Sequence, residues 1–202
     1  MPDSMSRQEF LRRGLGQLGR SLFRGFAPVL EATAPGPPPA PTPVVLRPPG
    51  ALPEPEFLAR CTGCNRCVER CPHDVISLSG GDGAPTRTPF LPGLAAKPCF
   101  LCEGLPCAEA CPEGALVPVP AEEVRIGIAV VDPRTCFAFK GQHCDYCIDR
   151  CPYSEQAIFA DDQDRPVVSA ERCTGCGLCA HFCVSSPGSI AVLPREAAAP
   201  RA

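Results

Sequence analysis

Apolar residues follow two different patterns along this chain. From Leu11 to Val29 they recur at three- and four-residue intervals with arginines among them, which predicts an amphipathic basic helix. In the C-terminal two thirds the apolar runs are short and separated by turn residues, which predicts short strands. We expect these strands at residues 75–78, 115–119, 126–131, 157–159, 166–168 and 189–193. The polar turns between them predict two hairpins, 115–119 with 126–131 and 157–159 with 166–168.

The same patterns divide the chain into four segments. Residues 1–31 are the amphipathic basic segment, and residues 32–56 are so rich in proline that we expect an extended linker. Residues 57–193 carry the short strands and are interpreted as the folded domain, in which residues 79–98 form a long surface loop. The alanine-rich residues 194–202 are typical of a disordered tail.

All 16 cysteines lie in the folded domain, in four runs of four. The first and fourth runs have two, two and three residues between successive cysteines, whereas the second and third runs carry insertions. Three of the four runs end in Cys-Pro, and the fourth has Val184 in that place. The candidate ligands are Cys61, Cys64, Cys67 and Cys71; Cys99, Cys102, Cys107 and Cys111; Cys136, Cys144, Cys147 and Cys151; and Cys173, Cys176, Cys179 and Cys183.

This spacing is typical of loops that hold [4Fe–4S] clusters, with three thiolates on one tight loop and a fourth just past a helical turn. Four runs therefore predict four [4Fe–4S] clusters. Disulfides within a run would be strained, and zinc sites usually gather two separated Cys-x-x-Cys pairs, so both alternatives are disfavoured. The chain has no tryptophan and two tyrosines, so the clusters would compensate for a small hydrophobic core.

In two-cluster ferredoxins the fourth cysteine of each run ligates the neighbouring cluster, so the runs must pair. Sequential pairing joins the first run to the second and the third to the fourth. We favour nested pairing, first with fourth and second with third, because the first and fourth runs share the compact spacing and a hairpin links the other two. The nested ligand sets are Cys61, Cys64, Cys67 and Cys183; Cys173, Cys176, Cys179 and Cys71; Cys99, Cys102, Cys107 and Cys151; and Cys136, Cys144, Cys147 and Cys111.

The expected fold is a small α+β protein with two bacterial ferredoxin-like modules, in which short β-hairpins and short helices surround the clusters. The net charge of −3 argues against a nucleic-acid partner, and no apolar run approaches the length of a membrane span. Nothing beyond the cysteines indicates a catalytic site. We therefore interpret the chain as an electron carrier and not an enzyme. The alternative is a maturation, assembly or scaffold protein for a partner redox enzyme.

The chain resembles the ferredoxin-type electron-transfer proteins of the NapG/MauM kind from Leu46 to Pro194. The most specific features are the four-residue gap after Cys102, the stretch Phe139-Lys-Gly-Gln-His-Cys-Asp-Tyr-Cys147, and Cys183-Val184. Such proteins accompany periplasmic nitrate reductase and methylamine utilisation. The resemblance implies an electron relay between a membrane quinol dehydrogenase-like partner and a terminal reductase or dehydrogenase. NapF-like proteins also carry four runs, but without the insertion in the second.

The family resemblance also implies export by a twin-arginine signal, and the N-terminus departs from that signal. Gln8 stands where the second arginine belongs, and Arg20 and Arg24 interrupt the expected apolar region. We therefore favour a cytoplasmic protein whose residues 1–31 make peripheral contact with a membrane. Periplasmic export through a degenerate twin-arginine signal is the alternative.

Overall fold

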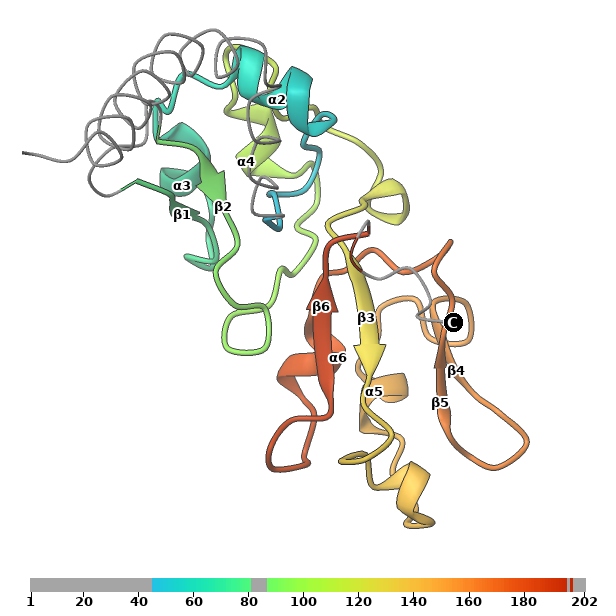
Figure 1. Ribbon diagram of the computed structural model, residues 1–202. Coiled ribbons are helices and arrows are strands. Elements are labelled where there is room, and N and C mark those ends of the chain that lie inside the picture. Colours follow the sequence, from blue (N-terminus) through green and yellow to red (C-terminus); the bar gives the residue numbers. More distant parts are fainter. Residues whose placement is uncertain (1–44, 81–86, 196, 198–202) are drawn as a thin grey trace, which may run out of the picture. The chain divides into compact units, whose positions relative to one another are not determined.

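The computed structural model describes residues 45–80, 87–195 and 197 (Figure 1). They belong to one of the two units into which the chain divides, Val44–Ala202. The predicted amphipathic helix in residues 1–31, most of the linker and most of the tail lie outside the described residues. Within the described ranges, no helix combines the length and apolar character needed to cross a membrane.

The first part of the described chain contains three short helices and one pair of strands (Figure 1). The α-helices are α2 (Glu54–Arg60), α3 (Arg66–Glu69) and α4 (Pro106–Glu109), followed by a 3-10 turn at Ala121–Glu123. Strand β1 (Ser77–Leu78) pairs antiparallel with β2 (Pro89–Phe90). The strand expected at 75–78 is thus confirmed over two residues, and its partner lies in the segment expected to be only a loop.

The second part adds two antiparallel strand pairs and two short helices (Figure 1). The strands are β3 (Ile128–Val131), β4 (Ile158–Ala160), β5 (Pro166–Val168) and β6 (Ile190–Leu193). The helices are α5 (Tyr146–Asp149) and α6 (Leu178–His181), with a 3-10 turn at Ala138–Lys140. Strand β4 pairs with β5, which confirms the predicted hairpin, and β3 pairs with β6, with Ile128 opposite Leu193.

The other predicted hairpin, 115–119 with 126–131, is wrong. Leu116 forms only an isolated antiparallel bridge, with Ala51, and β3 pairs with β6 at the end of the domain. Pro118 and Pro120 explain the failure, because a proline has no N–H to donate to a strand ladder. The segment after Leu116 therefore cannot extend its pairing.

Helix α2 begins at Glu54, inside the segment that proline content predicted to be extended. Proline is tolerated in the first helical turn, where its missing N–H would have no helical partner, and Pro55 lies in that turn. Glu54 and Glu56 add negative charge at the positive end of the helix. The single buried residue of α2 is Phe57, which is fully enclosed and anchors the helix to the core.

Two hydrophobic clusters form the interior, and Val192 of β6 packs against both of them. The first surrounds Phe57, Leu105 and Val124, and it includes Cys67 and Cys107. The second surrounds Ala129, Ile158 and Ile190, and it includes Cys147 and Cys179. We call the described residues up to Ile126 the first module and those from Ile128 onward the second module. Each module has its own core, and each core contains cysteine side chains.

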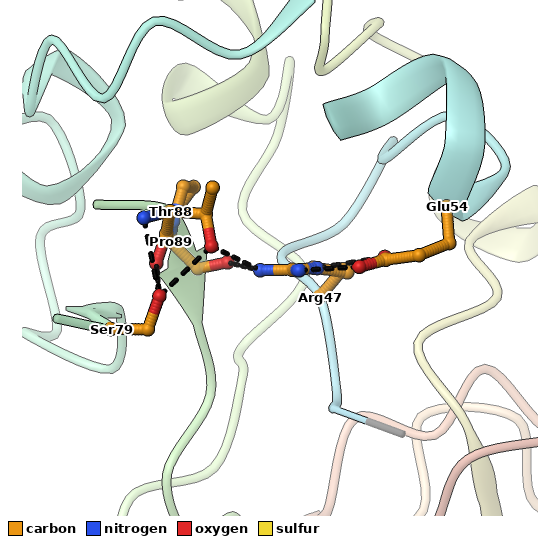
Figure 2. Close-up of polar contacts among 5 residues, drawn as sticks. All are labelled: Arg47, Glu54, Ser79, Thr88 and Pro89. Atoms are coloured by element: carbon orange, nitrogen blue, oxygen red, sulfur yellow. Dashed lines mark hydrogen bonds and ion pairs between the residues drawn. The ribbon is translucent and has the colours of Figure 1, made fainter. Parts of the chain in front are cut away.

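Arg47 links α2 to strand β2 in the first module (Figure 2). Its guanidinium donates hydrogen bonds to the Glu54 carboxylate (Nε···Oε2, 2.9 Å), to the Thr88 hydroxyl (3.0 Å) and to the Pro89 carbonyl (2.8 Å). The same group lies over the Phe57 ring, with Cζ 4.6 Å from the ring centroid. Only 12% of the Arg47 side chain is exposed. Arg47 therefore fixes α2 against the strand pair.

We expect Arg47→Ala to lower the free energy of unfolding by about 2–3 kcal/mol, because it removes charged hydrogen bonds and a cation–π contact from a largely buried site. The apparent unfolding temperature of the cluster-loaded protein measures this loss. Arg134→Ala is the matched control, since Arg134 also pairs with a carboxylate but is 86% exposed. The control should change the unfolding temperature little, and equal losses in both variants would contradict the role of Arg47.

Candidate functional site

The four cysteine runs fold in the same way. The third cysteine of each run lies on one short helix, α3, α4, α5 or α6, and is buried. The fourth cysteine follows two residues after the helix ends. Before three of these helices the backbone turns through a left-handed residue: Asn65 (φ 70°), Leu105 (φ 49°) or Gly177 (φ 85°). The third cysteine therefore lies within the helix and the fourth lies just past its end. Their side chains can then face different cavities.

Four cavities have four cysteines each in their walls. Site A is lined by Cys61, Cys64, Cys67 and Cys111. Site B is lined by Cys71, Cys99, Cys102 and Cys107. Site C is lined by Cys151, Cys173, Cys176 and Cys179. Site D is lined by Cys136, Cys144, Cys147 and Cys183. Every predicted site residue thus lies in one of the four walls, three from one run and the fourth from another.

These sets correct the nested pairing. Cys71 lines site B and Cys173 lines site C, so the first and fourth runs do not share a site. The pairing is sequential, because α3 packs against α4 and α5 packs against α6. The insertions in the second and third runs lie before these helices, so they do not affect which helices pack together. The symmetry of spacing that favoured nesting therefore carried no information about pairing.

Burial makes several of the cysteine thiols hard to ionise. Desolvation, with smaller contributions from neighbouring cysteines, raises the pKa of Cys67 to about 11 and the pKa of Cys147 to about 12. Desolvation also raises the pKa of Cys99 to about 12. Such thiols become thiolates only when a cation compensates their charge, and four soft sulfur donors suit iron. Each site therefore has the donor set for one [4Fe–4S] cluster.

The arrangement differs from that of a single-ion site. In the part of the chain that the structure describes, no group of three or more His, Cys, Asp or Glu side chains is arranged to hold one metal ion. All 16 cysteines lie in that part, and none is in a disulfide. In each site the four cysteines line the wall of a cavity, which is the arrangement that a multi-iron cluster requires.

Cys183 has surroundings that sequence reasoning missed. The Ser185 hydroxyl lies 3.0 Å from its Sγ, and the Ser189 N–H donates to the same sulfur at 3.3 Å. Burial alone would raise the pKa of Cys183, but the hydrogen bonds from Ser185 and Ser189 outweigh burial and lower it. Val184, in place of the proline that follows the other three runs, was the available signal that this segment leaves its site differently.

The two modules meet beside sites B and C. The Cys99 N–H donates to the Cys176 carbonyl at 2.8 Å, which joins a wall of site B directly to a wall of site C. The Ile126 N–H donates to the Thr174 carbonyl at 2.9 Å. Gly175 lies so close to Gly127 that a Cβ added to Gly175 would be 2.3 Å from the Gly127 nitrogen. The junction is therefore formed by closely packed backbone.

Three overlapping segments of the chain, residues 60–116, 98–155 and 128–184, match family models described as 4Fe-4S dicluster domains. Residues 60–116 contain the first and second cysteine runs. Residues 128–184 contain the third and fourth runs. These matches identify the small fold of short helices and strands as ferredoxin-like domains of the 4Fe-4S type. No solved structure matches the chain.

Curated relatives match over most of the chain. The methylamine utilization ferredoxin-type protein MauM of Methylophilus methylotrophus is 46% identical over 163 residues, which cover 75% of this chain and 72% of that protein. MauM of Methylorubrum extorquens is 39% identical over 206 residues, 96% of this chain and 92% of that protein. The ferredoxin-type protein NapG of Escherichia coli is 38% identical over 165 residues, 75% of this chain and 71% of that protein.

Proposed function

We propose that this chain, which belongs to the family of the MauM and NapG ferredoxin-type proteins, relays electrons through four [4Fe–4S] clusters in the order A, B, C, D. Family membership implies iron–sulfur electron transfer. The observation that carries the finer proposal is the hydrogen bond between Cys99 and Cys176, because it joins sites B and C and makes them the inner pair. The chain then acts as an electron-carrier subunit and not as an enzyme.

Each site would hold its cluster through its four cysteines, one thiolate for each iron. The bound cluster supplies one-electron redox chemistry. The protein keeps the four thiolates at fixed positions, excludes water with apolar walls and aims backbone N–H groups at sulfur. One such donor is the Leu116 N–H, 3.5 Å from Cys111 Sγ in site A.

The four short helices support the proposed order, because each contributes to two sites. Helix α3 carries Cys67 of site A, and Cys71 of site B follows it; α4 links the same two sites through Cys107 and Cys111. Four residues of helix rise about 6 Å, so neighbouring sites in a module lie close together.

Helices α5 and α6 repeat this arrangement in the second module. Cys147 of site D and Cys151 of site C flank the end of α5, and Cys179 and Cys183 link the same two sites through α6. A continuous path then runs from site A through the B–C junction to site D.

We further propose that the relay connects a membrane quinol dehydrogenase-like partner to a terminal reductase or dehydrogenase. Its location is proposed to be cytoplasmic, with peripheral membrane contact through residues 1–31; the alternative is periplasmic. The departures from a twin-arginine signal at Gln8, Arg20 and Arg24 support the first location. Determining the N-terminal residue of protein isolated from cell fractions distinguishes the two, because export would remove the signal.

Anaerobically purified protein is expected to contain about 16 iron and about 16 acid-labile sulfide per chain, from four cubanes. Redox titration followed by electron paramagnetic resonance (EPR) should detect four reversible one-electron centres. Magnetic coupling between neighbouring centres is expected in the fully reduced protein, because adjacent sites share helices. About half the iron would contradict four clusters. A full complement of iron without reversible reduction would favour the alternative of a maturation or scaffold protein.

A further inference from the structure

We propose that Ser185 and Ser189 raise the reduction potential of the cluster at site D, so that site D is the end of the relay where electrons collect before they leave. This inference rests on the four-site relay proposed above. It adds a direction to that relay, from site A toward site D, and assigns the direction to two serine side chains that follow the fourth run.

The two serines form a chain of hydrogen bonds that ends on a cysteine sulfur. Ser189 Oγ lies 2.6 Å from Ser185 Oγ, and Ser185 Oγ lies 3.0 Å from Cys183 Sγ. The Ser189 N–H also donates to Cys183 Sγ, at 3.3 Å. Both serines are buried, and the Asp132 N–H donates to the Ser189 carbonyl at 2.7 Å. That last bond holds the loop before β6 in position.

A thiolate bound to iron has no proton, so it can only accept hydrogen bonds. The Ser185 hydroxyl must then donate to Cys183 Sγ, which leaves its oxygen free to accept from the Ser189 hydroxyl. Each bond polarises the next, and burial strengthens them all. Donors to a cluster sulfur stabilise the more negative, reduced state, which raises the reduction potential.

The other runs lack this arrangement in their sequences. Two residues after the fourth cysteine, the first three runs have His73, Glu113 and Tyr153, and none of these is a small hydroxyl residue. The His73 ring is stacked on Phe100, with centroids 4.2 Å apart. At site A, the Leu116 N–H corresponds to the Ser189 N–H, and it is more distant from its sulfur, at 3.5 Å. At site C a single hydroxyl residue, Thr174, hydrogen-bonds through its side chain to Cys176. Site D instead combines a backbone hydrogen bond shorter than the one at site A with a chain of two hydroxyls.

Site D is also accessible from the surface. Tyr146 and Val184 line its cavity, and they are 50% and 49% exposed. Sites B and C adjoin each other at the module junction, so site D is an end of the proposed path. In each transfer a single electron passes from site C to site D. Site C is oxidised, site D is reduced, and no bond is made or broken. The electron then passes to the oxidised centre of the terminal oxidoreductase.

The test is an EPR-monitored redox titration of the full-length, cluster-loaded protein and its Ser185→Ala variant. One of the four potentials should fall, with about a tenfold loss in the equilibrium constant for reduction, or about 59 mV for a one-electron couple. Ser189→Ala should move the same potential by less, because it keeps the backbone N–H donor. Ser185→Thr, which retains a hydroxyl, should restore most of the potential.

Ser186→Ala is the matched control, because Ser186 lies in the same loop but is exposed. It should leave all four potentials unchanged. Iron and sulfide contents equal to those of the unsubstituted protein establish that site D is still loaded in each variant.

The potential that moves must also be the highest of the four in the unsubstituted protein. If Ser185→Ala moves no potential while iron content is retained, the inference is overturned and the relay stands. If the potential that moves is not the highest, the direction from A to D is overturned. If the unsubstituted protein has no reversible centres, the relay itself fails, which is a different result from either of these.

Discussion

The double variant Cys71→Ala/Cys107→Ala is expected to retain three intact [4Fe–4S] clusters, about 12 iron per chain. Both cysteines line site B, so the two substitutions destroy the same site. The loss should also destabilise the first module, since metal binding and folding are coupled. Iron and sulfide analysis combined with Mössbauer spectra, which count intact cubanes, measures the result.

The matched variant is Cys71→Ala/Cys179→Ala, which also removes two cysteines. Cys71 and Cys179 line sites B and C, so only two intact clusters should remain. Nested pairing makes the opposite prediction for both variants, because it assigns Cys71 and Cys179 to one cluster. Two intact clusters in the first variant and three in the second would therefore refute sequential pairing.

Gly175→Ala is expected to destabilise the protein by about 2–5 kcal/mol. Gly175 has a φ of +73°, where an L-residue costs about 1–2 kcal/mol. Its new Cβ would also lie 2.3 Å from the Gly127 nitrogen and 2.6 Å from the Gly127 oxygen, and overpacking of this kind costs about 1–3 kcal/mol. The apparent unfolding temperature and iron content of the loaded protein measure the effect.

Substitutions at two other glycines distinguish backbone strain from overpacking against Gly127. Gly141 has a φ of +78° but nothing within 4 Å of its Cβ position, so Gly141→Ala should show the backbone strain alone. Gly188 has neither feature, and Gly188→Ala should change the unfolding temperature little. A loss for Gly175→Ala no larger than that for Gly141→Ala would show that contact with Gly127 is not tight.

The parts of the fold that sequence predicted are local ones. Each run, with three cysteines, a helical turn and a fourth cysteine, occupies only 11 to 16 residues, so its spacing is enough to predict it. The β4–β5 hairpin is local as well. Its turn is set by Asp161, whose carboxylate accepts hydrogen bonds from the backbone of Gln163 and Arg165. The first three cysteines of each run line one cavity, and this grouping follows from the local pattern.

The parts that sequence did not predict depend on packing between distant segments. Whether Cys71 meets Cys107 or Cys179 is decided by the packing of α3 against α4, and no feature of the first run contains that information. Strand β3 likewise has an apolar pattern compatible with any partner, and β6 is about 60 residues away. The serine chain at Cys183 depends on how the loop 184–189 folds back, for which Val184 was the single sequence signal.

The pairing of β3 with β6 has a consequence for synthesis on the ribosome. The first module closes early, through the bridge between Ala51 and Leu116, whereas the second module cannot close until Leu193 has emerged. At usual translation rates of about 5–20 residues per second, the interval between these events is roughly 4–15 s. We therefore expect most of the walls of sites A and B to form while the cysteines of sites C and D are still unfolded. On this basis we expect the two modules to mature in order, with the N-terminal one first.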